Sequence, residues 1–286
     1  MIYFPLVTNY TPPPPVTCPI GAQVEGSAAA IQQWVVDGRP YLWPLRWAEC
    51  EVTKGVYTFP AKAEDNHRLL GSKQIIGTKT CPNWARLWPE WLCSPPTAEH
   101  YNDYARWLCH IIATYHPWGI EVMNEPDCRP KDSAPEQFGC WYDYRIGWYN
   151  SGVRYGGFTK AVYEYVKARY PETNLLVGAL MNVNESETFE FLRGAIAGGL
   201  RGDYLSYHGY ITERSGFDRI FTLADKFGSI LSMPKICTET SVLAHEDSEA
   251  LRLLQRDYLQ HIKDRLPSPM LEMVLWYTLA GNGWMN

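Results

Sequence analysis

Short apolar segments typical of β-strands alternate with helix-like segments about eight times along this chain of 286 residues. Strands are expected at Ile20–Val24, Tyr41–Trp47, Gln74–Thr80, Ile120–Met123, Leu175–Leu180, Tyr204–His208, Lys235–Thr238 and Leu271–Tyr277. Between them, helical spacing of apolar residues predicts helices at Ala28–Val36, Ala63–Leu70, Thr97–Tyr115, Gly156–Tyr170, Glu187–Ala197, Phe217–Leu231 and Ser248–Lys263. Because a helix separates successive strands, the strands are expected to run parallel, each helix being the crossover.

Eight strand–helix units in about 250 residues is the size of a (β/α)8, or TIM, barrel, which is the α/β fold class predicted here. An open doubly wound sheet has the same alternation, but its dinucleotide-binding version carries GxGxxG after the first strand, and the sequence has no such motif. Since few residues follow Tyr277, the final helix is expected to be incomplete.

The chain is predicted to form one domain. Residues 1–17, with the proline run Pro12–Pro15, are expected to be an N-terminal arm, and residues 18–286 a single (β/α)8 domain. No stretch reaches the ~18 consecutive apolar residues of a membrane helix. Met1–Tyr10 lacks the basic and apolar regions of a secretory signal, which predicts a cytoplasmic protein, or a secreted one whose signal has been removed.

Composition excludes one class of partner and favours another. The 26 Lys and Arg against 31 Asp and Glu give a net charge of −5, without a basic cluster, so nucleic acid is not expected to bind. Aromatic residues make up 14% of the chain, with 12 Trp and 19 Tyr. This excess indicates either a cleft for flat, hydroxylated ligands or a large aromatic core.

The cysteines and histidines do not predict a metal site. None of the 8 cysteines forms a CxxC pair, and the 7 histidines lack the His-x-His pattern of metal-dependent barrel hydrolases. Neither a metal nor another cofactor is therefore expected. Cys81 with Cys93, and Cys128 with Cys140, bracket two loops; each pair is either a disulfide in an oxidising compartment or a pair of free thiols.

Polar residues lie where predicted strands end, which is where a TIM barrel holds its active site. Glu125 follows the fourth strand, Glu239 follows the seventh, and His208 ends the sixth. Two carboxyl groups facing each other across a cleft are what cleavage of a glycosidic bond requires. One is a protonated acid for the leaving oxygen, and the other is an ionised nucleophile or base.

Several runs of sequence resemble glycoside hydrolases of clan A, the retaining (β/α)8 enzymes. Residues 120–127 (IEVMNEPD) resemble the strand-four motif that holds the acid/base, and residues 234–241 (PKICTETS) resemble the strand-seven motif that holds the nucleophile. Three further runs resemble the branch that includes family 39 β-xylosidases: 47–59 (WAECEVTKGVYTF), 80–85 (TCPNWA) and 207–210 (YHGY). Together these matches span roughly residues 20 to 280.

The resemblance implies a role for each polar residue at the strand ends. Glu125 would be the acid/base and Glu239 the nucleophile. Asn124 would bond the 2-hydroxyl of the sugar, while His208 and Tyr210 would lie beside the nucleophile, Tyr210 donating to its carboxylate. For a retaining enzyme the two carboxyl groups are expected about 5–5.5 Å apart.

Aromatic residues are expected to shape the substrate cleft. The resemblance implies that Trp276 is the platform under the sugar at the cleaved bond. Trp47, Trp84 and Trp141 are also predicted to bind substrate, and the aromatic-rich loop 127–151 is expected to wall one side of the cleft.

One position departs from the branch, which has an arginine on strand two where this chain has Leu42; Arg46 is out of phase. The predicted function is a retaining glycoside hydrolase that cleaves β-glycosidic bonds of oligo- or polysaccharides by double displacement. A non-catalytic glycan-binding barrel and a transglycosylase using the same site are the alternatives. The sugar and its linkage are left open.

Overall fold

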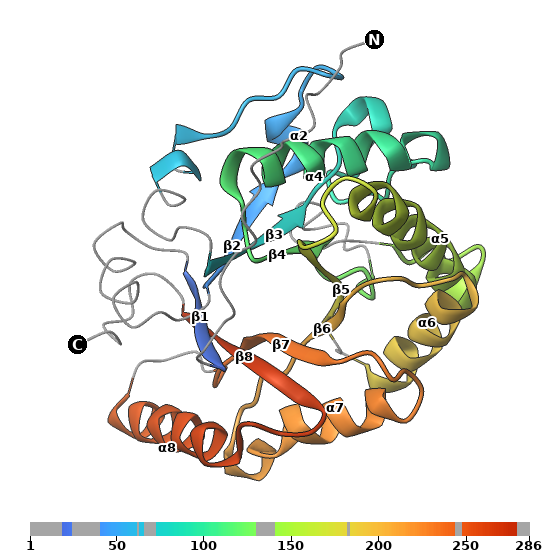
Figure 1. Ribbon diagram of the computed structural model, residues 1–286. Coiled ribbons are helices and arrows are strands. Elements are labelled where there is room, and N and C mark those ends of the chain that lie inside the picture. The colour runs from blue at the N-terminus through green and yellow to red at the C-terminus, as the bar shows by residue number, and fades with distance from the viewer. Residues whose placement is uncertain are drawn as a thin grey trace.

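The computed structural model describes residues 19–24, 41–61, 63–65, 73–129, 141–181, 184–243 and 248–278. Eight parallel strands close into a barrel in chain order, with the first paired to the last (Figure 1). They are β1 (Ile20–Val24), β2 (Tyr41–Arg46), β3 (Gln74–Lys79), β4 (Gly119–Val122), β5 (Asn174–Leu180), β6 (Tyr204–His208), β7 (Lys235–Thr240) and β8 (Leu271–Thr278). The predicted TIM barrel is therefore confirmed.

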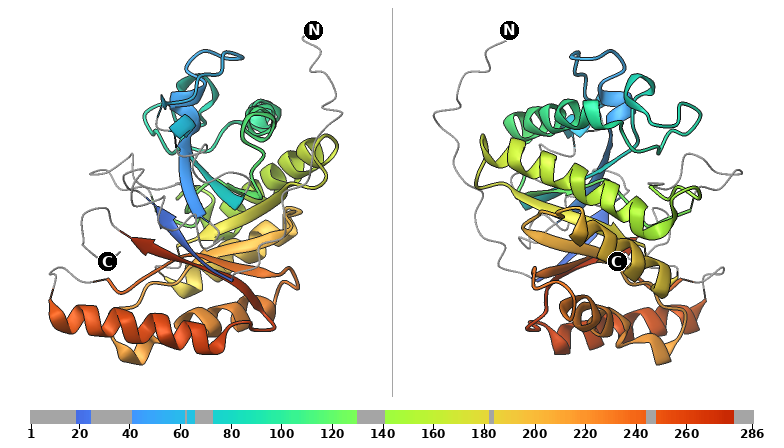
Figure 2. Two further views of the ribbon diagram at one scale, coloured as in Figure 1. Left: turned by 60° about the vertical axis from the view of Figure 1, so that its left-hand side comes forward. Right: turned by 90° about the vertical axis from the view of Figure 1, so that its right-hand side faces the viewer.

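Helices cover the outside of the strand ring (Figures 1 and 2). They are α2 (Trp47–Cys50), α4 (Tyr101–Tyr115), α5 (Gly147–Lys167), α6 (Glu185–Ala197), α7 (Arg219–Gly228) and α8 (Glu249–Arg265), with 3-10 turns at Asn83–Ala85, Ala98–His100 and Arg214–Gly216. None of the helices in the described ranges is long and apolar enough to cross a membrane. The expected arm 1–17, the expected helix Ala28–Val36 and most of Ala63–Leu70 lie outside the described residues.

Helix α5 begins at Gly147, earlier than the predicted Gly156, because its glycines are packing residues rather than helix breaks. A Cβ atom on Gly152 would lie 2.0 Å from the Phe191 carbonyl oxygen, and one on Gly156 would lie 2.1 Å from that of Ala195. Both carbonyl groups belong to α6, and Figure 2 shows α5 and α6 side by side. The glycines thus allow α5 and α6 to approach closely.

The two faces of each strand pack against different surroundings. Residues of β3, β5, β7 and β8 join one small buried cluster, which includes Ile75, Leu176, Ile236, Met273 and Leu275. Of these strands, β3, β5 and β7 are not neighbours in the barrel, so their side chains meet in the barrel interior. Residues that alternate with these along a strand, such as Val274, face outward and belong to the larger core that includes the helices. Alternation along a strand therefore tells which side chains can reach the barrel axis.

Strand β7 breaks this alternation with a one-residue bulge. In the pairing of β6 with β7, Tyr207 is opposite Cys237 and His208 is opposite Glu239. Thr238 of β7 therefore has no partner residue in β6. Beyond the bulge, the Thr240 hydroxyl contacts the Tyr258 hydroxyl of α8 at 2.9 Å, outside the barrel. A bulge re-aims the side chains that follow it, and here it leaves Glu239 on the same side as His208.

Candidate active site

Four predicted site residues meet at the carboxyl ends of β4, β6 and β7. Glu125 and Glu239 are 6% and 7% exposed, and one atom from each lies within 4.8 Å of the other and of a His208 ring nitrogen. His208 Nδ1 is 3.1 Å from Glu125 Oε1 and 3.6 Å from Glu239 Oε2. The Tyr210 hydroxyl donates to Glu239 Oε2. Residues far apart in the sequence thus form one buried cluster.

The backbone after β4 is held in a rarely adopted conformation. Met123 and Glu125 have φ of 56° and 52°, in the left-handed region, which costs of order 1–3 kcal/mol for a residue other than glycine. Neighbouring strands fix it: the Asn124 amide donates to the Thr78 carbonyl at 2.8 Å, and the Glu125 amide donates to that of Ala179 at 3.1 Å. The surrounding barrel therefore determines where the Glu125 carboxyl points.

Burial and charge set the protonation of this cluster. Burial raises the pKa of Glu125, and the negative charges of Glu239 and Asp127 add to this, while His208 opposes it. Burial lowers the pKa of His208, but Glu239 and Glu125 outweigh it and raise that pKa to about 10. Burial and the Glu239 charge raise the pKa of Tyr210, so its hydroxyl keeps the proton that it donates.

Two further charged residues lie beside Glu239, and neither was predicted. A cavity of about 30 Å³, enough for about one water, is lined by residues that include Lys79, Glu121, Asn124 and Glu239. Glu121 is 1% exposed, burial raises its pKa, and its Oε2 lacks a hydrogen-bond partner of good geometry among the described residues. A charged residue inside an otherwise apolar strand was the available signal for Glu121.

Trp276 is not placed as the predicted platform. Its ring lies 5.7 Å from Tyr258 of α8, and its backbone is aligned with Thr240, so the side chain faces the helix layer. The next residue, Tyr277, faces the other way, and its ring lies 5.9 Å from that of Tyr210. Since adjacent strand residues point to opposite faces, the assignment of Trp276 is corrected: Tyr277 is the aromatic residue of β8 on the site side.

The other predicted tryptophans serve the core. Trp47 and Trp141 are both 0% exposed; Trp47 packs against Tyr104, and Trp141 against Tyr155. Their predicted contact with substrate is therefore corrected to a role in packing. Trp84 is half-buried and lies edge-on to Trp47 at 5.6 Å, with its indole N–H donated to the Glu51 carbonyl at 3.0 Å. None of the three contacts the carboxyl pair.

The loop predicted at 127–151 is only partly a loop. Asp127 ties its start to the barrel, since its carboxylate accepts from the Met181 amide at 2.7 Å and the Thr188 hydroxyl at 2.6 Å. Residues 130–140 lie outside the described residues, and 147–151 belong to α5. The part between them lines a cavity considered below.

The two cysteine pairs have different outcomes. Cys81 is a free, buried thiol whose Sγ is 3.7 Å from the Pro82 carbonyl oxygen, so no disulfide joins it to Cys93. Cys140 lies outside the described residues, so the pairing with Cys128 stays a prediction.

Glu125, His208 and Glu239 also offer three atoms that a metal ion can bind. In this arrangement the Glu125 and Glu239 oxygens already accept hydrogen bonds from His208 and Tyr210. A metal ion held by these three atoms would compete with the hydrogen bond between His208 and Glu125.

Comparison with solved structures confirms the fold. The chain is similar to a family 39 glycoside hydrolase from the gut symbiont Bacteroides cellulosilyticus WH2, with a TM-score of 0.65 and 16% identity, over 91% of this chain and 56% of that one. It thus spans little more than half the length of that protein.

Two further solved structures are similar over most of their length. An intracellular xylanase from Thermoanaerobacterium saccharolyticum has a TM-score of 0.59 and 15% identity, over 91% of this chain and 85% of that one. A GH128 endo-β-1,3-glucanase from Sorangium cellulosum has a TM-score of 0.56 and 16% identity, over 93% and 90%. No family model and no curated protein matches the sequence. These three structures are glycoside hydrolases, and at 15–16% identity the likeness shows that this chain shares their barrel fold.

Proposed function

We propose that the protein is a retaining β-glycoside hydrolase in which Glu125 is the acid/base and Glu239 the nucleophile. The observation that carries the proposal is the buried carboxyl pair, with atoms of the two side chains within 4.8 Å of each other. Retaining enzymes hold their carboxyl groups about 5–5.5 Å apart, whereas inverting enzymes leave about 6.5–9.5 Å for a water. The short gap supports direct attack by one carboxylate.

In the first step, Glu239 attacks the anomeric carbon as the bond to the leaving oxygen breaks, and Glu125 gives its proton to that oxygen. Its buried site and raised pKa suit Glu125 to carry this proton near neutral pH. In the second step, Glu125 takes a proton from water, the hydroxide attacks the anomeric carbon, and Glu239 leaves. The hydroxyl of Tyr210 orients the nucleophile throughout.

Residues around the small cavity suit contact with the sugar being cleaved. Asn124 lines it together with Glu239, which supports the proposed contact between the Asn124 amide and the sugar hydroxyl next to the anomeric carbon. Lys79 brings a positive charge to the same cavity. Tyr277 takes the platform role that the sequence assigned to its neighbour, since its ring packs against Tyr210.

Hydrolysis of a panel of aryl β-glycosides tests the proposal, using wild type and Glu239→Ala with and without azide. We expect Glu239→Ala to lose at least about 10⁴-fold in kcat/KM and azide to restore turnover as a glycosyl azide of inverted anomer. Glu49→Ala, which removes an exposed carboxylate after β2, is the matched control and should remain active. Loss of wild-type activity in EDTA would point instead to a metal at the same three residues.

A further inference from the structure

A larger cavity lies between the loops that follow β3 and β4. Its volume is about 410 Å³, and the residues that line it include Trp88, Trp91, Arg129, Tyr142, Tyr144 and Arg145. This volume is in the range of cavities that bind small molecules. Both loops leave the carboxyl ends of their strands, which is the end of the barrel where Glu125 lies.

The wall of this cavity includes ion pairs to the buried carboxylate of Asp143. The Asp143 carboxylate is 3% exposed, and it accepts from Arg145 Nε and Nη2 at 2.9 Å each and from Arg154 at 3.3 Å. Arg145 lowers the pKa of Asp143 to about 2, so this carboxylate is ionised. The pairs fix the cavity before a ligand arrives, which reduces the entropy lost on binding.

A second group of lining residues gathers around Arg129. The Arg129 guanidinium lies 5.3 Å from the Tyr142 ring and 5.5 Å from the Trp148 ring, and it is paired with Glu187. The Tyr142 and Trp148 rings are 4.1 Å apart. This part of the lining therefore combines aromatic rings with the charged groups of Arg129 and Glu187.

The lining selects a neutral, hydroxylated ligand. Among the lining residues, Arg129 and Arg145 are balanced by Glu90 and Asp143, so the site has no net charge toward an ionic group. Aromatic faces pack against the C–H faces of a sugar ring, and charged side chains at the rim bond its hydroxyls. Tyr144 is 82% exposed, which leaves its ring open to such a ligand.

The position of the cavity relative to Glu125 tells which part of a substrate it takes. Arg129 is four residues beyond Glu125, so their Cα atoms are at most about 14 Å apart. The cavity is lined by residues that follow β3 and β4, and Glu125 follows β4 whereas Glu239 is in β7. In the proposed function Glu125 protonates the leaving oxygen, so the side of Glu125 is the side of the leaving group. Resting on that function, we infer that the cavity is a subsite for a neutral sugar unit on the leaving-group side of an oligosaccharide.

The test compares long and short substrates in three variants. Tyr144→Ala and Trp91→Ala should each lose about three- to tenfold in kcat/KM on β-linked xylo- and gluco-oligosaccharides of four to six units, as expected for one aromatic contact. Neither should change on aryl monoglycosides, whose leaving group is too short. Tyr149→Ala, an aromatic 43% exposed on α5 and not lining the cavity, is the matched control. Equal kinetics of all variants on long substrates would overturn the inference.

Direct binding separates this inference from the proposed function. If wild type cleaves nothing, calorimetric titration of Glu239→Gln with the same oligosaccharides still measures the cavity. Binding that Trp91→Ala weakens, while Tyr149→Ala does not, supports a sugar site even without hydrolysis. Absence of binding to every oligosaccharide overturns the cavity as a sugar site.

Discussion

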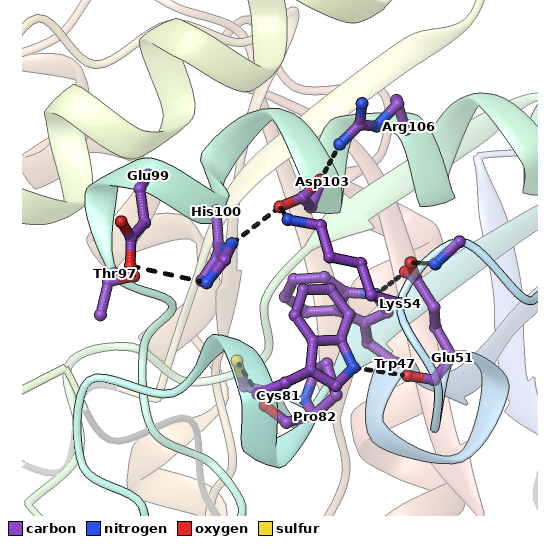
Figure 3. Close-up of polar contacts among 12 residues, drawn as sticks. Trp47, Glu51, Lys54, Cys81, Pro82, Thr97, Glu99, His100, Asp103 and Arg106 are labelled. Carbon is purple, nitrogen blue, oxygen red and sulfur yellow. Dashed lines mark hydrogen bonds and ion pairs between the residues drawn. The ribbon is translucent and has the colours of Figure 1, made fainter. Parts of the chain in front are cut away.

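Two buried charged clusters lie in the same barrel and are satisfied to different degrees. Near β2, Asp103 is 3% exposed and contacts Lys54 at 2.8 Å, His100 at 2.7 Å and Arg106 (Figure 3). Beside it, the Glu51 carboxylate accepts from the Trp47 indole at 2.6 Å and the Gly55 amide at 2.7 Å. Every carboxylate oxygen of this network has a partner.

The cluster at the barrel mouth is the opposite case. Three buried carboxyl groups, from Glu121, Glu125 and Glu239, share one His208. Glu121 Oε2 and His208 Nε2 lack hydrogen-bond partners among the described residues. A satisfied cluster holds elements together, whereas uncompensated charge is found where a ligand is to be bound or changed. The difference assigns the first cluster to stability and the second to chemistry.

The largest expected effect is on activity, when one carboxyl group of the cluster at the barrel mouth is replaced. Glu125→Gln should lower kcat/KM about 10²–10⁴-fold for glycosides with a poor leaving group. A dinitrophenyl glycoside, which needs no proton, should be cleaved in the first step almost as fast as by wild type. Burst kinetics on both substrates measure this, and thermal unfolding should show no loss of stability. Equal losses on both leaving groups would exclude Glu125 as the acid.

The pH profile sharpens the same assignment. Since burial raises the pKa of Glu125 above its ordinary 4.5, the protonated acid persists to higher pH than in a free glutamate. Above that raised pKa, kcat/KM on a poor leaving group should fall about tenfold per pH unit. In Glu125→Gln this alkaline limb should disappear. A limb that is unchanged in the variant would assign the titration to another group.

Breaking the β2 network should affect stability alone. Asp103→Asn removes the charge that Lys54, His100 and Arg106 contact, and the free energy of unfolding should fall by about 1.5–3 kcal/mol. The kcat/KM of the folded variant should equal that of wild type at a temperature below its unfolding. Urea unfolding measures the free energy of unfolding. A large loss of kcat/KM in the folded variant would contradict a purely structural role of this network.

The smallest expected effect comes from neutralising the unsatisfied carboxyl. Glu121 has a raised pKa in the folded protein, so its contribution to stability is present at low pH and lost as pH rises through that pKa. Glu121→Gln should therefore stabilise the fold by about 1–3 kcal/mol at pH 7 and have no such effect well below pH 4. Thermal unfolding across this range checks the sign; destabilisation at pH 7 would contradict it.

The sequence predicted what depends on periodicity and on motifs. The strands lie close to their expected bounds, and Glu125, Glu239, His208 and Tyr210 meet as the resemblance implied. Side-chain direction was harder to predict. Trp276 and Tyr277 are both aromatic, so composition cannot tell which of them faces the site.

The sequence also did not show which side chains are buried against distant helices and strands. Trp47 and Trp141 pack against residues remote in the sequence, where no local pattern distinguishes a core tryptophan from one in a cleft. Glycines are typical of helix ends, but those within α5 allow close contact with α6. Each of these errors concerns tertiary packing, which overrides local preference.

The bulge in β7 makes the direction of Glu239, the proposed nucleophile, depend on the number of residues in the strand. In a regular strand that kept all of its residues, Thr238 would pair with His208, and the carboxylate of Glu239 would turn toward the helix layer. An alignment of this strand with a regular one therefore needs a one-residue gap at Thr238. Without that gap, Glu239 is aligned with an outward-facing residue, and its place beside Glu125 and His208 is missed.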